Sequence, residues 1–158
     1  IEENGPFESY PEESWDKIMD VNLKGVFLCC QVFGKIMASN KAGSIINISS
    51  VEGHKPDKGL GVYSISKAAI SMLTKSQAKE WGKYGVRSNA ICPGLIRTKL
   101  SSVLWQNEEM LEAWLGDLPI RRPGDPDEIS GMALYLASEA SSYTTGETFN
   151  IDGGYMIN

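Results

Sequence analysis

Three side chains near the middle of the chain could carry out acid–base chemistry together. Tyr63 and Lys67 are four residues apart in a stretch with helical periodicity, which places them on one helix face. Ser50 directly follows a short apolar stretch that is typical of a strand. A free phenol has a pKa of ~10. Because a nearby ammonium and the positive end of a helix both favour phenolate, we expect the pKa of Tyr63 to be lowered.

Such a trio predicts proton transfer at a carbonyl or alcohol oxygen. A tuned phenol can donate a proton to a carbonyl oxygen or accept one from an alcohol, and the Ser50 hydroxyl can hydrogen-bond the same oxygen. No side chain supplies a hydride, so a redox reaction needs a separate carrier. Taken alone, Tyr63 and Lys67 could equally be a solvated surface pair, and Ser50 an ordinary strand-end hydroxyl. The functional interpretation therefore depends on their joint placement.

The elements that would position these side chains alternate between helix and strand. The expected order is a helix over residues 12–37, a strand over 44–49, a helix over 62–81, a strand over 86–91, a weakly helical stretch over 100–118, a helix starting at Asp125-Pro126-Asp127-Glu128 and ending near Ala137, and a strand over 147–151. Asp125 is expected as the N-cap and Pro126 at the first helical position. This alternation predicts an α/β fold with a parallel sheet and helices on both faces.

The predicted sheet places several polar groups at one edge. Ser50 follows the first strand, and Pro93-Gly94 follows the second. The helix that carries Tyr63 and Lys67 begins at this same end. Ligands of open parallel sheets bind beyond the carboxyl ends of the strands, so we expect the site there.

The composition argues against several other classes of protein. The 158 residues carry a net charge of −5 and show no basic face, so nucleic acid is not an expected partner. The longest apolar run is far shorter than the ~18 residues of a membrane span, and no membrane partner is expected. Cys29, Cys30 and Cys92 are too few for a disulfide framework or a zinc site. We therefore expect reduced thiols, a cytoplasmic protein and no metal.

The motifs resemble those of the short-chain dehydrogenase/reductases. In that family a catalytic Ser precedes a Tyr-x-x-x-Lys motif by thirteen positions, and 63 − 50 = 13 here, which selects Ser50 over Ser49. Further stretches match family motifs: Asp20-Val21-Asn22-Leu23-Lys24-Gly25, the segment from Arg87 to Gly94 with Thr98 after it, and Asn150-Ile151-Asp152-Gly153-Gly154. The resemblance covers nearly the whole chain.

The resemblance implies a role for each matching residue. Tyr63 would be the general acid/base, and Lys67 would hold the nicotinamide ribose and lower the pKa of Tyr63. Ser50 would orient the substrate oxygen, and Asn22 would distort its helix and hold a water in a proton relay. The residues lining the nicotinamide of NAD or NADP would be Pro93, Gly94, Ile96 and Thr98. Implied substrates are ketones or secondary alcohols, such as a 3-oxoacyl thioester, a sugar or a xenobiotic carbonyl.

The resemblance also implies that part of the domain lies outside this sequence. Family members begin with a strand and a Gly-rich turn for the pyrophosphate, and neither is found here. Residues 1–158 are thus expected to be the C-terminal catalytic half of a Rossmann-like domain, with the residues that choose NAD or NADP in the other half. The alternative from another class is a catalytically silent fragment that serves only as an assembly module. Homo-oligomerisation, as a dimer or tetramer, is expected through helices 12–37 and 62–81.

Overall fold

The computed structural model describes residues 5–116 and 118–157. Its helices are α1 (Glu12–Met19), α2 (Gly25–Asn40), α3 (Gly61–Trp81), α4 (Ser102–Gln106), α5 (Glu108–Leu115) and α6 (Asp127–Ala137), and its strands are β1 (Gly43–Ile48), β2 (Val86–Pro93) and β3 (Thr148–Ile151). Within these residues the strands form one parallel sheet in the order β1-β2-β3. The predicted element order and α/β class are confirmed, and the strand boundaries move by one or two residues.

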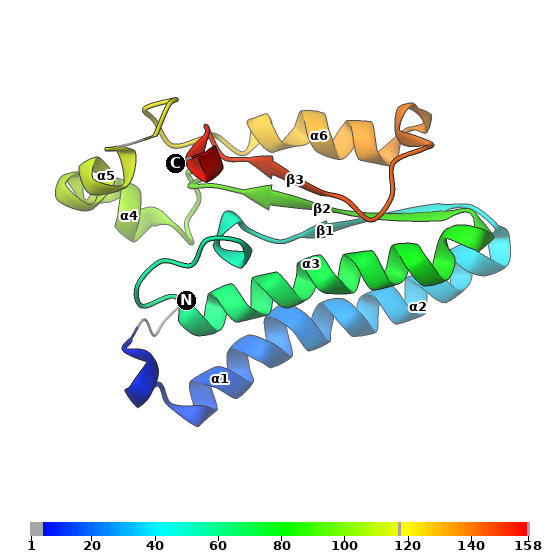
Figure 1. Ribbon diagram of the computed structural model, residues 1–158, viewed down its shortest axis with the longest axis horizontal. Coiled ribbons are helices and arrows are strands. Elements are labelled where there is room, and N and C mark those ends of the chain that lie inside the picture. Colours follow the sequence, from blue (N-terminus) through cyan, green and yellow to red (C-terminus); the bar gives the residue numbers. More distant parts are fainter. Residues whose placement is uncertain (1–4, 117, 158) are drawn as a thin grey trace.

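Helices cover both faces of the sheet (Figure 1). The pair α2 and α3 lies on one face, and α6 lies on the other. The short helices α4 and α5 lie beyond the carboxyl ends of β2 and β3, close to the start of α3 and to the C-terminus. Several loops thus meet at one end of the molecule, where parallel sheets bind ligands.

The first helical segment is continuous but contains one π-helical stretch. A π turn over Asp20–Lys24 joins α1 to α2, and Asn22 lies at its centre. The distortion that the family resemblance implied at Asn22 is therefore present. The helix ends at Asn40, three residues later than the predicted Met37, because Lys41 adopts a left-handed conformation with a φ of 55°. A π turn adds one residue to the helical ladder and is often found at functional sites.

This continuous helix is long and apolar enough to cross a membrane, which was not predicted from the sequence. Glu12–Asn40 spans 29 residues, and one 18-residue window has a mean hydropathy of 1.3, enough by length and composition to cross a membrane. Its α2 part nevertheless packs against β1 and α3 in the layer that covers the sheet. A covering helix of a sheet passes the same test, so the expectation of no membrane partner stays a prediction.

Strand β1 lies at the edge of the sheet, because among the described residues it pairs only with β2. Ile45 and Asn47 point toward the α2–α3 layer and are buried. On the opposite face Ser44 donates a hydrogen bond to the carbonyl of Leu136 in α6, at 2.7 Å. Ile48 at the end of the strand is 50% exposed. The middle of the strand is therefore buried on the α2–α3 face and only partly buried on the α6 face, where Ile46 lies.

The start of α6 lies within one residue of the prediction. The helix begins at Asp127, and Pro126 is the residue that precedes it. The cap comes from Glu128, whose Oε2 accepts a hydrogen bond from the Asp125 backbone N–H at 2.8 Å. Arg122 donates two further hydrogen bonds of 2.7 Å to the same carboxylate, and together these bonds lower the pKa of Glu128 to about 2. Pro126 already has helical φ and ψ values of −53° and −35°, and the bond from the Asp125 N–H to Glu128 is the capping-box bond expected for Asp125 as the N-cap.

Candidate active site

The end of β1 is tied to the first turns of α3. Ser49 Oγ donates a hydrogen bond to the carbonyl of Lys67 at 2.7 Å and contacts Ser71 Oγ at 3.2 Å. The turn Val51–Gly53 then packs directly on the helix backbone. A Cβ atom on Gly53 would lie 2.9 Å from the backbone N of Ala68, so only glycine allows this approach. The contact places Ser50 beside the face of α3 that carries Tyr63.

Ser50 and Tyr63 interact through their side chains. A hydrogen bond with Ser50 lowers the pKa of Tyr63, but burial outweighs it, and the nearby charge of Glu52 acts in the same direction as burial. The pKa of Tyr63 is therefore raised above its ordinary value. The predicted lowering of the Tyr63 pKa is wrong for this structure, because burial disfavours the phenolate more strongly than the hydrogen bond with Ser50 favours it. At neutral pH the phenol consequently keeps its proton.

Lys67 lies next to the same pair. Its Nζ donates a hydrogen bond of 3.0 Å to the carbonyl of Ile48 and lies 5.6 Å from the centre of the Tyr63 ring. Burial lowers the pKa of Lys67, and the charge of Cys92 partly opposes this shift. An ammonium held at the end of β1 could bind hydroxyl groups such as those of a ribose.

Asn22 approaches the site from the π turn. Its Nδ2 donates a hydrogen bond of 3.1 Å to Ser66 Oγ, and Ser66 Oγ donates one of 2.6 Å to the carbonyl of Tyr63. Asn22 thus reaches α3 at the residue before Lys67. The sequence interpretation assigned Ser66 no role. Ser66 is completely buried in the same helix as Tyr63 and Lys67. The sequence shows its place in the helix but not its burial, so the sequence alone gave no reason to select it.

The loop after β2 is held by its own backbone. Gly94 donates a hydrogen bond of 3.0 Å to the carbonyl of Ile151, and a Cβ at Gly94 would lie 2.9 Å from Asp152 Cα. Ile96 forms a parallel bridge with Gly124. Thr98 Oγ1 lies 3.1 Å from Ser101 Oγ, which also donates to the carbonyl of Ile96. The loop therefore has a defined shape in which part of its hydrogen-bonding capacity is already used.

These residues fit a nicotinamide nucleotide. The Lys67 ammonium lies at the end of β1, and the Pro93-Gly94 turn lies at the end of the neighbouring strand, where nucleotide cofactors bind in such sheets. Gly94 lets the turn lie directly against Asp152 at the end of β3. Over residues 5–116 and 118–157 no three His, Cys, Asp or Glu side chains gather in a way that could hold a metal.

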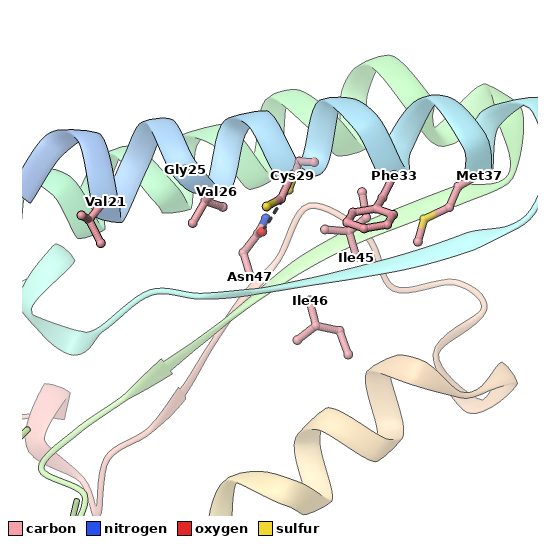
Figure 2. Close-up of a pocket in the computed structure, with 10 residues that line it drawn as sticks. Val21, Gly25, Val26, Cys29, Phe33, Met37, Ile45, Ile46 and Asn47 are labelled. Atoms are coloured by element: carbon pink, nitrogen blue, oxygen red, sulfur yellow. Dashed lines mark hydrogen bonds between the residues drawn. The ribbon is translucent and has the colours of Figure 1, made fainter. Parts of the chain in front are cut away.

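A groove lies outside this site. It has a volume of about 460 Å³ and runs between α2 and β1. Figure 2 shows Val26, Cys29 and Phe33 reaching into it from the helix, above Ile45 and Asn47 of the strand. Its lining is mostly apolar and includes none of Asn22, Ser50, Tyr63 and Lys67. We call it the apolar groove and distinguish it from the site.

Known proteins place this arrangement in a family. A family model described as enoyl-(acyl carrier protein) reductase matches residues 1–156. The curated relatives similar to the chain include a galactitol 2-dehydrogenase and a dehydrogenase/reductase named as an SDR family member, and a similar solved structure is that of a gluconate 5-dehydrogenase. The chain belongs to the short-chain dehydrogenase/reductase family. Its Rossmann-type α/β fold is shared with solved members of that family.

Individual relatives resemble the chain at moderate identity. It is 40% identical over 153 residues to galactitol 2-dehydrogenase of Rhizobium johnstonii, a match covering 95% of this chain and 59% of the relative. It is 42% identical over 146 residues to a 3-oxoacyl-[acyl-carrier-protein] reductase of Synechocystis, covering 92% and 57%. A crystal structure of a gluconate 5-dehydrogenase from Burkholderia cenocepacia, in complex with NADP and tartrate, superposes with a TM-score of 0.97 at 33% identity, covering 100% and 62%. The chain thus spans less than two thirds of the length of these proteins.

Proposed function

We propose that this chain is the catalytic part of an NAD(P)-dependent oxidoreductase that interconverts a ketone and a secondary alcohol. The observation that carries the proposal is the joint placement at the carboxyl end of the sheet of Ser50, which favours the Tyr63 phenolate, and of Lys67 Nζ, which lies 5.6 Å from the centre of the Tyr63 ring. Two hydroxyl donors side by side suit one carbonyl oxygen. Family membership supports a nicotinamide as the redox partner.

In the direction of reduction, Tyr63 acts as the general acid. Its raised pKa keeps the phenol protonated at neutral pH, so it can donate its proton to the oxygen as negative charge develops there. The Ser50 hydroxyl donates a hydrogen bond to the same oxygen and holds it in place. A bound nicotinamide supplies or accepts the hydride at the carbon. In the reverse direction the phenolate takes the proton of the alcohol.

Lys67 and Asn22 complete the proposed site. Lys67 would hold the cofactor ribose, and its positive charge would favour the phenolate left after proton transfer. Asn22, fixed by Ser66, would hold a water that passes protons between Lys67 and solvent. Pro93, Gly94, Ile96 and Thr98 would contact the nicotinamide.

The relatives support a proposal for the substrate class. They include a galactitol dehydrogenase and a 3-oxoacyl-[acyl-carrier-protein] reductase, which supports a polyol, a sugar or a 3-oxoacyl thioester as substrate. The helices α4 and α5, with Trp105 and Trp114, would cover this substrate. We leave the choice between NAD and NADP open.

We further propose that these 158 residues form the C-terminal catalytic half of a Rossmann-like domain and are inactive alone. The open edge of β1, the apolar groove beside it and the partial coverage of the relatives support this.

The second candidate, a catalytically silent assembly module, is favoured by the exposed apolar side chains of Phe27, Phe33 and Met72 on α2 and α3. These side chains also support a homo-oligomer, which light scattering would test. A cytoplasmic location remains part of the proposal and is supported by three free cysteines.

The test of the function is an activity screen of the whole protein. Galactitol, a gluconate, a simple ketone and a 3-oxoacyl thioester would each be offered with NAD(H) and NADP(H), and nicotinamide absorbance would be followed. Turnover of at least one substrate is expected, and it should disappear in Tyr63→Phe. Cofactor binding without turnover of any carbonyl or alcohol would support the silent module instead.

A further inference from the structure

A second polar cluster lies directly behind the proposed site. It consists of Glu52, Asp57 and Tyr155, which we call the carboxyl clamp. Glu52 is 8% exposed, and its Oε2 accepts hydrogen bonds from the Asp57 backbone N–H at 2.9 Å and from Ser64 Oγ at 3.3 Å. Ser64 is adjacent to Tyr63, and Glu52 follows Ser50 by two residues. One carboxyl group thus joins the loop after Ser50 to the first turn of α3.

The other half of the clamp extends to the C-terminus. The Tyr155 hydroxyl donates a hydrogen bond of 3.0 Å to Asp57 Oδ1. The Tyr155 ring is stacked on Trp114 of α5, with ring centres 5.1 Å apart and planes 2° from parallel. Lys55 Nζ lies 4.7 Å from the centre of the same ring. Figure 1 shows the C-terminal turn beside α5, at the end where the site lies.

We propose that Glu52 is a positioning residue, which with Asp57 and Tyr155 holds the loop after Ser50 and helix α5 in the arrangement that presents a substrate oxygen to Ser50 and Tyr63. The inference rests on the proposed function and extends it to the substrate side of the site. Glu52 itself is buried and bonded within the protein, so it acts through its neighbours. Its loss should therefore affect substrate affinity more than the chemical step.

The clamp depends on the protonation of the Glu52 carboxyl group. Burial and the adjacent Asp57 raise the pKa of Glu52 to about 7, because two neighbouring carboxylates repel each other in a poorly solvated site. The ionisable groups around Glu52 are Asp57, Tyr63 and Tyr155, with Lys55 over the Tyr155 ring. Below this pKa the Glu52 carboxyl is protonated and the loop is clamped. Above it Glu52 carries a negative charge beside Asp57, and the repulsion loosens the loop.

Glu52→Gln and Glu52→Ala separate the predicted roles in the whole protein. Glutamine keeps an acceptor for Asp57 and Ser64 and imitates the protonated acid, whereas alanine removes every bond. In the unaltered protein we expect the substrate KM to rise about tenfold between about pH 6 and about pH 8, with a smaller change in kcat. Glu52→Gln should give a KM that is low and flat with pH, and Glu52→Ala one that is high throughout. Glu80→Gln, an exposed acid at the far end of α3, serves as the matched control.

A fluorescence titration tests the clamp without any turnover. Because Trp114 is stacked on Tyr155, its emission should change through neutral pH in the unaltered protein but not in Glu52→Gln, and Trp114→Phe should remove the change. Failure of the unaltered protein to turn over any substrate would refute the proposed function, and this titration would still decide the clamp. The clamp is overturned if Glu52→Gln keeps the pH-dependent KM or the pH-dependent emission of the unaltered protein.

Discussion

The carboxyl end of the sheet and the open edge of β1 differ in how their side chains are satisfied: polar groups are hydrogen-bonded at the first, and apolar groups are exposed at the second. At the carboxyl end, polar side chains make hydrogen bonds between distant segments, as Ser49 Oγ does to the backbone carbonyl of Lys67 and Asn22 Nδ2 to Ser66 Oγ. Along the edge, apolar side chains of α2 such as Phe33 and Ile36 remain more than half exposed. Strand β1 belongs to both regions, because it forms the open edge and ends at the proposed site. The difference indicates that the described residues complete the proposed catalytic end but leave the edge uncovered.

The largest expected effect comes from Tyr63→Phe in the whole protein. Phenylalanine keeps the ring and removes only the proton, so turnover should fall by about a thousandfold or more. Nicotinamide binding, measured by fluorescence titration, should stay within a few-fold of the unaltered value. Tyr143→Phe is the matched control, since Tyr143 is fully exposed. Near-normal turnover in Tyr63→Phe would remove this residue from its proposed role.

The second prediction concerns the edge. Expressed alone, residues 1–158 should aggregate or self-associate, because β1 offers unpaired backbone groups beside the apolar groove. Exposed apolar surface costs roughly 25 cal/mol per Å², which favours any contact that covers it. Size-exclusion chromatography with light scattering measures the outcome. A monodisperse monomer that binds a dinucleotide would contradict both this prediction and the proposal that the domain continues outside these residues.

Lys67→Ala should have the next largest effect. Removing the ammonium should weaken nicotinamide binding at least tenfold and move the alkaline limb of the pH–rate profile upward by about one pH unit, because a charge that favours phenolate is lost. Lys79→Ala, an exposed change at the other end of α3, should do neither. If affinity falls but the profile keeps its shape, Lys67 binds the ribose and does not tune Tyr63.

The smallest effect is expected at Asn47, where the two regions meet. Asn47 Nδ2 donates to Thr74 Oγ1 at 2.9 Å and to Gln77 Oε1 at 3.0 Å, while the residue also lines the apolar groove. Asn47→Ala removes both bonds, leaving Gln77 Oε1 with only the Ser88 hydroxyl as a donor, and should reduce the free energy of unfolding by about 1–3 kcal/mol. Ser76→Ala, an exposed change on the same helix, should lie within about 0.5 kcal/mol of zero. Equal stability of the two variants would show that the Asn47 network contributes little.

Much of the architecture was predictable from local pattern. Helical spacing located α3, and the apolar stretch before Ser50 located β1, each within one residue of its bounds. The interval between Ser50 and Tyr63 selected the serine that interacts with Tyr63, while Ser49 bonds to the helix backbone. The start of α6 was predicted within one residue, and Glu128 makes the expected capping-box bond to the Asp125 N–H.

The sequence by itself determined the order of the elements, the family motifs and the residues that could transfer a proton. These depend on periodicity and spacing, which are properties of neighbouring residues. Only the tertiary structure decided the direction of the Tyr63 pKa, because burial depends on every segment packed around the ring. It also decided the carboxyl clamp, since Tyr155 reaches Asp57 across 98 positions of sequence. Such a contact leaves no local pattern, because it forms only when the parallel sheet brings the carboxyl ends of β1 and β3 to the same edge, on either side of β2.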